Sequence, residues 1–246
     1  FMCSGHGRSE AFWKEHPCPD GLKIVDLAQD FRDEREGYVY GLPEWQREKI
    51  AGASKIANPG CFATCIQLAL LPGAIVEPVG VTAVTGSTGA GVKPGPTTHF
   101  SWRNNNISAY KVMEHQHLAE MQRNLSILNR KPVKLDFVPL RGDFARGIFA
   151  SVTLSSDLSE ADAVQLFKDY YSTARFTFVS DSPVDLKEVV NTNKAVLHVE
   201  KHARTLVVTS VIDNLLKGAS GQAVQNMNLI FGLPEDEGLR LKASAF

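Results

Sequence analysis

The segment NPGCFATCIQLALLP, residues 58–72, constrains the fold more than any other stretch of the chain. We expect a helix here, with Asn58 as its N-cap and Pro59 at the first helical position, where the missing N–H costs nothing. The residues that follow are almost continuously apolar, so the helix should be buried, and Pro72-Gly73 should end it. The sequence therefore predicts a buried central helix around which the other elements pack.

A cysteine, Cys61, occupies the first turn of this helix. Unpaired backbone N–H groups and the positive end of the helix dipole favour a thiolate there, and the thiolate is the nucleophilic form. We therefore expect its pKa to lie below the roughly 8.5 of a free thiol. The alternative is that Cys61 is a small core residue, as we expect for Cys65 one turn deeper. Position alone leaves both interpretations of Cys61 open.

Composition narrows the classes of protein to which the chain can belong. Its 246 residues are 43% apolar and 22% charged, which is typical of one large or two small soluble domains. A net charge of −1 gives no reason to expect nucleic acid or an anionic membrane as a partner. No apolar run approaches the roughly 20 residues of a membrane span. The four cysteines lack the spacing of a disulfide framework, so we expect a cytoplasmic protein.

The first part of the chain has the pattern of a parallel sheet. A short helix capped by Ser9 precedes a strand at residues 22–27, and a second helix begins near Leu42-Pro43. A short strand follows at residues 55–57. Strand, helix and strand at this spacing predict a βαβ unit.

A glycine-rich loop from Gly86 to Gly91 follows a predicted strand at residues 79–85. Its bare backbone could approach a ligand closely, although the same pattern is also typical of a plain turn. Residues 93–106 have no clear periodicity, which is typical of either an ordered functional loop or a disordered one. The next helix is expected from His117 to Leu128.

The second half of the chain changes character. Strand-like segments come in a run, with one amphipathic helix capped by Ser159 among them. This order predicts an α+β half built on an antiparallel or mixed sheet. The expected strands are 133–139, 147–154, 195–199 and 205–212, and the expected helices are 159–175 and 222–231.

Two histidines, His115 and His117, stand one residue apart before the predicted helix. They could be surface or core residues, groups that act on a ligand, or metal ligands on one strand. No further cluster of cysteines or histidines lies nearby to complete a metal site, so we predict none.

Several blocks resemble one family, the N-acetyl-γ-glutamyl-phosphate reductases, which are enzymes of arginine biosynthesis. Asn58-Pro59-Gly60-Cys61 with the apolar helix behind it is similar to the family's active-site signature. The other similar blocks are Tyr40 to Glu44, His115-x-His117 followed by Glu120, Arg146-Gly147-Ile148, Gln225 to Asn228, Phe231 to Pro234, and Leu239 to Leu241. Together these blocks span nearly the whole chain in the family's order.

The resemblance implies a fold of class α/β plus α+β. We expect an incomplete Rossmann-type NADP-binding domain at residues 1–57, joined by a C-terminal helix within 219–246. Residues 58–218 should form a catalytic and dimerisation domain that resembles that of glyceraldehyde-3-phosphate dehydrogenase. Family members open with a strand and a Gly-x-x-Gly-x-x-Gly turn for the NADPH phosphates. No such motif occurs here, so we expect roughly 70 further residues upstream of Phe1.

The resemblance also implies a reaction, the NADPH-dependent reduction of an acyl phosphate to a semialdehyde with release of inorganic phosphate. Cys61 would attack the acyl carbonyl to give a thioester, which hydride then reduces. Histidine suits the proton transfers near neutral pH, and the resemblance gives that role to His117. The order of the two histidines stays open, and no motif fixes whether the substrate's N-acyl group is acetyl, succinyl or carrier-bound.

The same resemblance implies which residues surround the reactants. The substrate carries a phosphate and a carboxylate, which guanidinium groups can bind in bidentate fashion. The expected substrate-binding residues are Tyr110, His115, Arg103, Arg141 and Arg146. The expected cofactor-binding residues are His6, Ser9, Gly86, Ser87, Gly89, Gly91 and Asn228.

The resemblance further implies a homodimer or homotetramer, because the sheet of such a catalytic domain usually pairs subunits. Two alternatives to the family's function remain. One is a related acyl-phosphate reductase such as aspartate-semialdehyde dehydrogenase, and the other is a non-catalytic binding fragment.

Overall fold

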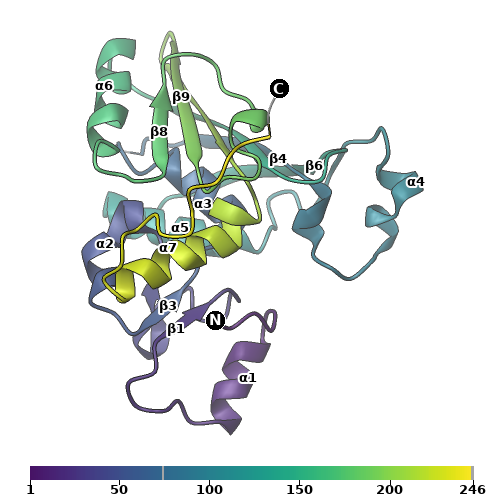
Figure 1. Ribbon diagram of the computed structural model, residues 1–246. Helices are drawn as coiled ribbons and strands as arrows, with labels where there is room; N and C mark the ends of the chain where they lie inside the picture. The colour runs from purple at the N-terminus through teal and green to yellow at the C-terminus, as the bar shows by residue number, and fades with distance from the viewer. Residues whose placement is uncertain (74, 245–246) are drawn as a thin grey trace.

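The computed structural model describes residues 1–73 and 75–244, which form two β-sheets with helices around them (Figure 1). The smaller sheet has three parallel strands in the order β1-β3-β2, and Met2 adds a single parallel bridge to Asp26. Its strands are β1 (Ile24–Asp26), β2 (Val39–Tyr40) and β3 (Lys55–Ala57).

The larger sheet is mixed, with the strand order β5-β6-β4-β7-β10-β9-β8. The pairs β4–β6 and β8–β9 are parallel, and the other neighbours are antiparallel. This architecture confirms the predicted combination of a parallel layer and a mixed-sheet half. The strands are β4 (Val79–Thr85), β5 (Ser108–Ala109), β6 (Leu135–Arg141), β7 (Ile148–Ser155), β8 (Thr177–Ser180), β9 (Ala195–His202) and β10 (Thr205–Ile212).

The helices lie on both sheets and between them. The α-helices are α1 (Arg8–Glu15), α2 (Pro43–Ala51), α3 (Cys61–Leu68), α4 (Phe100–Arg103), α5 (His117–Asn129), α6 (Glu160–Tyr170) and α7 (Gly221–Ile230). Short 3₁₀ turns occur at Arg35–Gly37, Ser87–Ala90, Pro96–Thr98 and Leu186–Glu188, and η5 (Leu216–Ser220) is a π-helix.

The main core forms between α3 and one face of the large sheet. Alternate residues of β7 are buried there, and α3 packs against β7, β10 and α5. Because α3 is apolar on nearly every side, it must be enclosed in this way to remove its surface from water. The predicted central buried helix is confirmed, but it ends at Leu68, earlier than the expected stop at Pro72-Gly73.

The last helix returns to the first sheet. Ala223 and Ile230 of α7 share a hydrophobic cluster with Val25, Ile50 and Ile56. Figure 1 shows α7, in yellow, between the large sheet and the purple N-terminal elements. The C-terminal helix therefore completes the N-terminal layer, and it brings the segment before it close to α3.

Two predicted helix starts are wrong. Gly60, not Asn58, is the N-cap of α3, and the Asn58 side chain instead donates to the carbonyl of Ala219. Ser9 is not the cap of α1 either. Its side chain is buried, while the Asp30 carboxylate accepts the backbone N–H groups at the start of that helix. For α1, a residue distant in the chain thus supplies what a local cap was expected to supply, whereas α3 has no side-chain cap.

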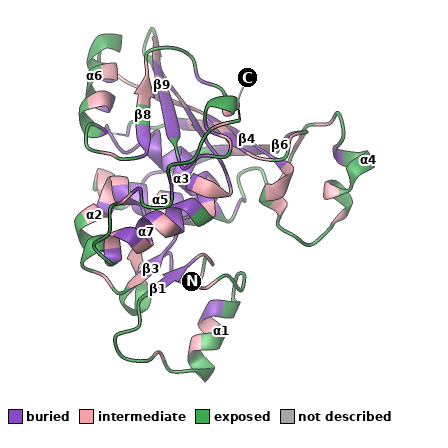
Figure 2. Cartoon of the chain, viewed as in Figure 1, coloured by how far each residue is buried: buried purple, intermediate pink, exposed green. Residues whose placement is uncertain are grey.

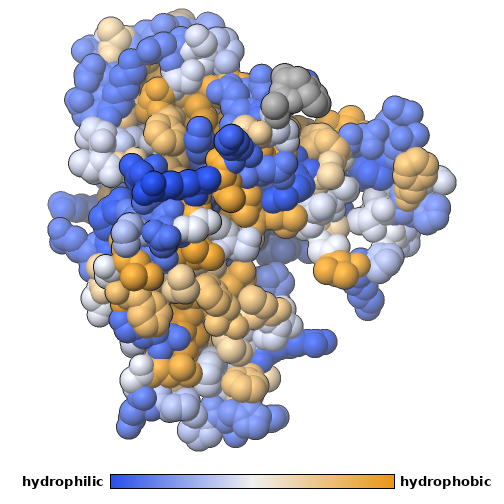
Figure 3. Space-filling model, in the orientation of Figure 1, coloured by the Kyte–Doolittle hydropathy of each residue, from blue (hydrophilic) through white to orange (hydrophobic). Residues whose placement is uncertain are grey.

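A segment that we call the arm (residues 92–107) projects from the body and carries α4 (Figures 1 and 2). Large apolar side chains are exposed along it, and Figure 3 shows some orange atoms on the projection. These side chains are Val92, Phe100, Trp102 and Ile107. Among residues 1–73 and 75–244, no helix combines the length and the hydropathy that crossing a bilayer demands.

Candidate active site

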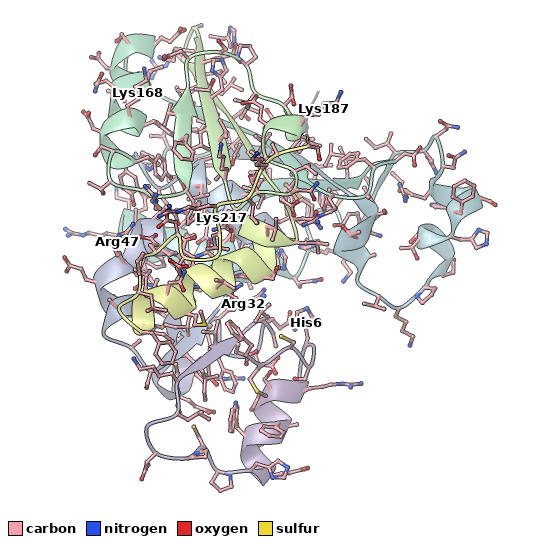
Figure 4. All side chains as sticks on the ribbon, viewed as in Figure 1. His6, Arg32, Arg47, Lys168, Lys187 and Lys217 are labelled. Carbon is pink, nitrogen blue, oxygen red and sulfur yellow. The ribbon has the colours of Figure 1, made fainter. Side chains whose placement is uncertain are left out.

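Seven of the predicted site residues line one cavity of about 210 Å³, beside the first turn of α3. The cavity lies where the loop before α3, the glycine-rich loop after β4, the start of α5 and the η5 segment meet. The seven residues are Cys61, His117, His115, Tyr110, His6, Gly89 and Gly91. In Figure 4, His6 and Arg32 lie together on the N-terminal side of this cavity.

Cys61 is the first residue of α3, next to its N-cap Gly60. Burial raises the pKa of the Cys61 thiol to about 11 and outweighs the opposite effects of the Phe62 backbone N–H and of Arg32. The prediction of a lowered pKa is therefore wrong for the protein without substrate. The thiol needs a base close by to become a nucleophile at neutral pH.

The loop before Cys61 is held by a buried ion pair that the sequence did not reveal. Arg32 donates to the carbonyl oxygen of Asn58 (2.9 Å) and forms a 2.9 Å ion pair with Glu120. Glu120 in turn accepts the backbone N–H of Gly60 (2.9 Å) and the hydroxyl of Tyr40 (2.6 Å). Both ends of the turn that presents Cys61 are thus fixed by one pair of charges. The only sequence signal was the three-residue spacing between His117 and Glu120, which puts both on one side of a helix.

The two histidines lie against each other, with ring centroids 4.7 Å apart. His115 Nδ1 accepts the backbone N–H of His117 (3.2 Å). Burial, aided by nearby cations, lowers the pKa of His115 to about 4 and that of His117 well below its ordinary value. Both imidazoles are therefore neutral near pH 7. Within the described residues, Nδ1 of His117 is buried without a hydrogen-bond partner.

Tyr110 lines the cavity beside His115, and Arg141 packs against the Tyr110 ring. The Arg141 guanidinium is 4.4 Å from the centroid of the Tyr110 ring, a cation–π contact. Burial raises the pKa of Tyr110 to about 12, so its hydroxyl keeps its proton at neutral pH. Arg141 itself is not part of the cavity wall.

Comparison with known proteins identifies the family to which this chain belongs. The family model described as "Semialdehyde dehydrogenase, dimerisation domain" matches residues 61–214, and "Semialdehyde dehydrogenase, NAD binding domain" matches residues 1–53. The whole chain is 55% identical to 78% of the N-acetyl-gamma-glutamyl-phosphate reductase of Azobacteroides pseudotrichonymphae genomovar. CFP2. It is 52% identical to 79% of the Bacteroides fragilis protein of the same name. The chain belongs to the N-acetyl-γ-glutamyl-phosphate reductase family.

Solved structures show the same fold in more distant proteins. Aspartate semialdehyde dehydrogenase II from Vibrio cholerae, complexed with ASA, superposes with a TM-score of 0.71 at 18% identity over 92% of this chain and 77% of that chain. A probable aspartate-semialdehyde dehydrogenase from Pseudomonas aeruginosa gives 0.66 at 16% identity over 86% of this chain and 73% of that one. At these identities the likeness concerns the fold alone.

Three of the predicted ligand-binding side chains of this reductase-family chain are engaged elsewhere. Arg103 is buried at the base of the arm, and its guanidinium donates to four groups there. Arg146 pairs with Asp213 (3.0 Å), and Asn228 donates to carbonyls of the C-terminal tail. The four acceptors of Arg103 are the carbonyls of Thr97, Asn106 and Arg141 and the hydroxyl of Ser108. None of the three lines the cavity.

The remaining predicted contacts also separate into two groups. Gly89 and Gly91 face the cavity, whereas Gly86 and Ser87 turn toward the loop before β7. A Cβ on Gly86 would lie 2.5 Å from the carbonyl oxygen of Ala145, so only glycine fits there. Ser9 lies outside the cavity, where its hydroxyl donates to Asp26 (3.0 Å).

One wall of the cavity was not predicted at all. It comes from Asn214 and Leu215 after β10 and from Gly218 and Ala219 of η5. A Cβ on Gly218 would lie 2.8 Å from Cβ of Cys61, so the backbone of η5 rests directly on the cysteine. The Lys-Gly-Ala-Ser-Gly run before the last helix was its only sequence signal. Within the part of the chain that the structure describes, no cluster of three or more metal-ligating side chains occurs.

Proposed function

We propose that the protein catalyses the NADPH-dependent reduction of N-acetyl-γ-glutamyl phosphate to N-acetylglutamate 5-semialdehyde in arginine biosynthesis. The observation that carries this proposal is the position of Cys61, at the start of a buried helix and in one cavity with His117. Relatives that are more than half identical over the whole chain and bear the name of this reductase support the choice of substrate.

In the first step, His117 takes the proton of the Cys61 thiol. A base is needed because burial holds the thiol pKa near 11, and His117 is suited to it because its imidazole is neutral. The sulfur then forms a bond to the acyl carbon, and the bond from that carbon to the phosphate oxygen breaks. Inorganic phosphate leaves and a thioester remains on Cys61. The same histidine returns a proton when the semialdehyde departs.

The cavity fits a flat nicotinamide ring. Gly89, Gly91 and Gly218 line it without side chains, which allows a ring to approach closely at these positions. Oγ1 of Thr85 in the cavity lining is buried without a hydrogen-bond partner within the described residues, so it is free to bind an amide. The matched NAD-binding family model supports a nicotinamide cofactor, and we propose NADPH rather than NADH. When bound, the cofactor supplies the hydride.

We assign recognition of the substrate's anionic groups to Arg141 and Tyr110. Arg141 is the one of the three predicted arginines whose guanidinium contacts a side chain of the cavity wall. His115 stands between Tyr110 and His117 and orients the latter through the hydrogen bond to its backbone. Arg103 and Arg146 then stabilise the loops around the site.

We further propose that two or four copies associate through the large sheet. One face of that sheet packs on α3, while the other carries a row of half-buried or exposed side chains. This row runs through Val138, Thr82, Ser151, Thr209 and His198. The dimerisation model matched at residues 61–214 supports this assembly.

We propose residues 1–57 with 219–246 as the cofactor-binding unit and residues 58–218 as the catalytic unit. The cluster that α7 shares with the small sheet supports this division. We place the reaction in the cytoplasm, where the four free cysteines would stay reduced.

The test is formation of the thioester, which requires no cofactor. The chain is mixed with N-acetyl-γ-glutamyl phosphate, and the release of inorganic phosphate is measured. The acyl adduct on Cys61 is followed by peptide mass spectrometry. We expect stoichiometric acylation of Cys61 and none in C61S. The matched control is C65S, one helical turn away, which should acylate normally because Cys65 is buried against Ser210.

A folded chain that acylates with aspartyl phosphate and not with the acetylated substrate would favour aspartate-semialdehyde dehydrogenase activity. A folded chain that acylates with neither would refute the proposed chemistry.

A further inference from the structure

A second buried ion pair lies outside the cavity and has no part in the chemistry above. Lys217 and Glu44 are both almost completely buried, with their charged atoms 2.8 Å apart. Burial alone raises the pKa of Glu44, but Lys217 and hydrogen bonds bring it below its ordinary value. Figure 4 places Lys217 in the interior, beside α7. Removing two charges from water has a large desolvation cost, so the presence of this buried pair requires a structural reason.

The pair joins four elements at one point. Lys217 Nζ donates to Glu44 at the start of α2 and to Gln225 of α7, each at 2.8 Å. Glu44 also accepts the hydroxyl of Thr177 in β8 (2.7 Å). Lys217 itself belongs to η5, so the ammonium group ties that short π-helix to α2 and α7 and, through Glu44, to β8.

The π-helical geometry determines where the neighbours of Lys217 point. The N–H groups of Gly218 and Ser220 each bond to the carbonyl five residues earlier, at 2.9 and 2.8 Å. The carboxylate of Asp213 accepts the N–H groups of Leu215 and Leu216, so the segment starts with a wide turn.

The consequence is that three consecutive residues have three separate contacts. Lys217 forms the buried ion pair with Glu44, and Gly218 rests against Cys61. The carbonyl of Ala219 accepts a hydrogen bond from the side chain of Asn58. Any shift of Lys217 is therefore passed directly to the backbone that touches the cysteine.

We infer that the Lys217–Glu44 pair is a positioning device that holds η5 against Cys61, an inference that rests on the proposed role of Cys61 as the nucleophile. The pair fixes the wall of the cavity that Gly218 forms against Cys61 and so determines the orientation in which the sulfur meets the acyl carbon. Lys217 and Glu44 touch neither substrate nor cofactor and act only through Gly218.

The test measures the acylation rate of Cys61 against substrate concentration in the full chain. K217M/E44M removes both charges and keeps side-chain bulk, and such replacements are often neutral for stability. We expect a thermal midpoint close to that of the parent, an unchanged half-saturating concentration, and a maximal rate lower by roughly 10- to 100-fold, the cost of a misplaced reacting group. The matched control is K168M, which removes the exposed Lys168–Asp181 pair and should acylate at the parental rate.

A purely structural role would lower the folded fraction and leave the rate of folded molecules unchanged. A folded K217M/E44M protein with the parental maximal rate therefore overturns the inference. If that variant does not fold, E44Q, which keeps the shape of Glu44 without its charge, is judged by the same rate. Lack of acylation in the parent chain would count against the proposed function instead, and so the two failures are distinguishable.

Discussion

Two buried polar side chains on helix α5, His117 and Glu120, lie one turn apart and face the same cysteine loop, yet their surroundings differ. Glu120 accepts hydrogen bonds from Arg32, Tyr40 and the backbone of Gly60. Nδ1 of His117 has no partner among the described residues. A buried polar atom without a partner costs stability, and this cost is consistent with the proposed role of His117 as the base. The satisfied carboxylate, in contrast, marks a group kept for the fold.

The first prediction sharpens this contrast at His117. We expect H117N to slow acylation of Cys61 by about 10²–10⁴-fold, the usual contribution of a general base. Stability at pH 7 should change little, because Nδ1 of His117 holds nothing in place. The measurements are phosphate release and urea unfolding, with H202N at an exposed position as the control. An H117N protein that acylates at the parental rate would shift the base to His115.

The second prediction concerns Glu120. We expect E120A to lower the free energy of unfolding by about 3–5 kcal/mol, because Arg32 would remain buried without its partner. Urea unfolding at pH 7 measures this loss, and E120Q, which retains most of the hydrogen bonds, should lose less. A loss below about 1 kcal/mol, the range of an exposed pair, would show that Glu120 does not stabilise the fold and so contradict its contrast with His117.

The third prediction is the pH dependence of stability. The pKa values of His115 and His117 are lower in the folded chain than the ordinary 6.5, so the folded state binds fewer protons than the unfolded state. The stability that the two neutral imidazoles contribute to the folded state is fully present above pH 6.5, and it is lost as the pH falls toward about 4. In thermal unfolding at pH 7 and pH 5, H115N/H117N should lose less stability than the parent. Equal losses would show that the imidazoles are not buried as described.

The smallest effect is expected at Arg103, which was predicted to bind substrate. R103M should leave acylation of Cys61 unchanged and increase hydrogen exchange mainly in the arm, because the guanidinium holds the carbonyls of Thr97 and Asn106 in that segment. Exchange measured by mass spectrometry for residues 95–107 checks this. A raised half-saturating substrate concentration in R103M would show that Arg103 takes part in substrate binding.

The sequence by itself determined the elements whose cause is local. The apolar run after Gly60 required a buried helix, the alternation in residues 79–85 gave the bounds of β4, and His117 began α5 as expected. The motifs around Cys61 and the histidines also led to the right family, because relatives that match the whole chain bear its name.

Only the tertiary structure decided which polar groups are free to act. Arg146 is paired with Asp213, 67 residues away, and Asn228 is occupied by the tail that follows its helix. Cys61 has a raised pKa because elements from the whole chain remove it from water, and this desolvation exceeds the effect of its own helix. Hydrogen-bond partners and burial depend on contacts between distant segments, and no local pattern in the sequence records them.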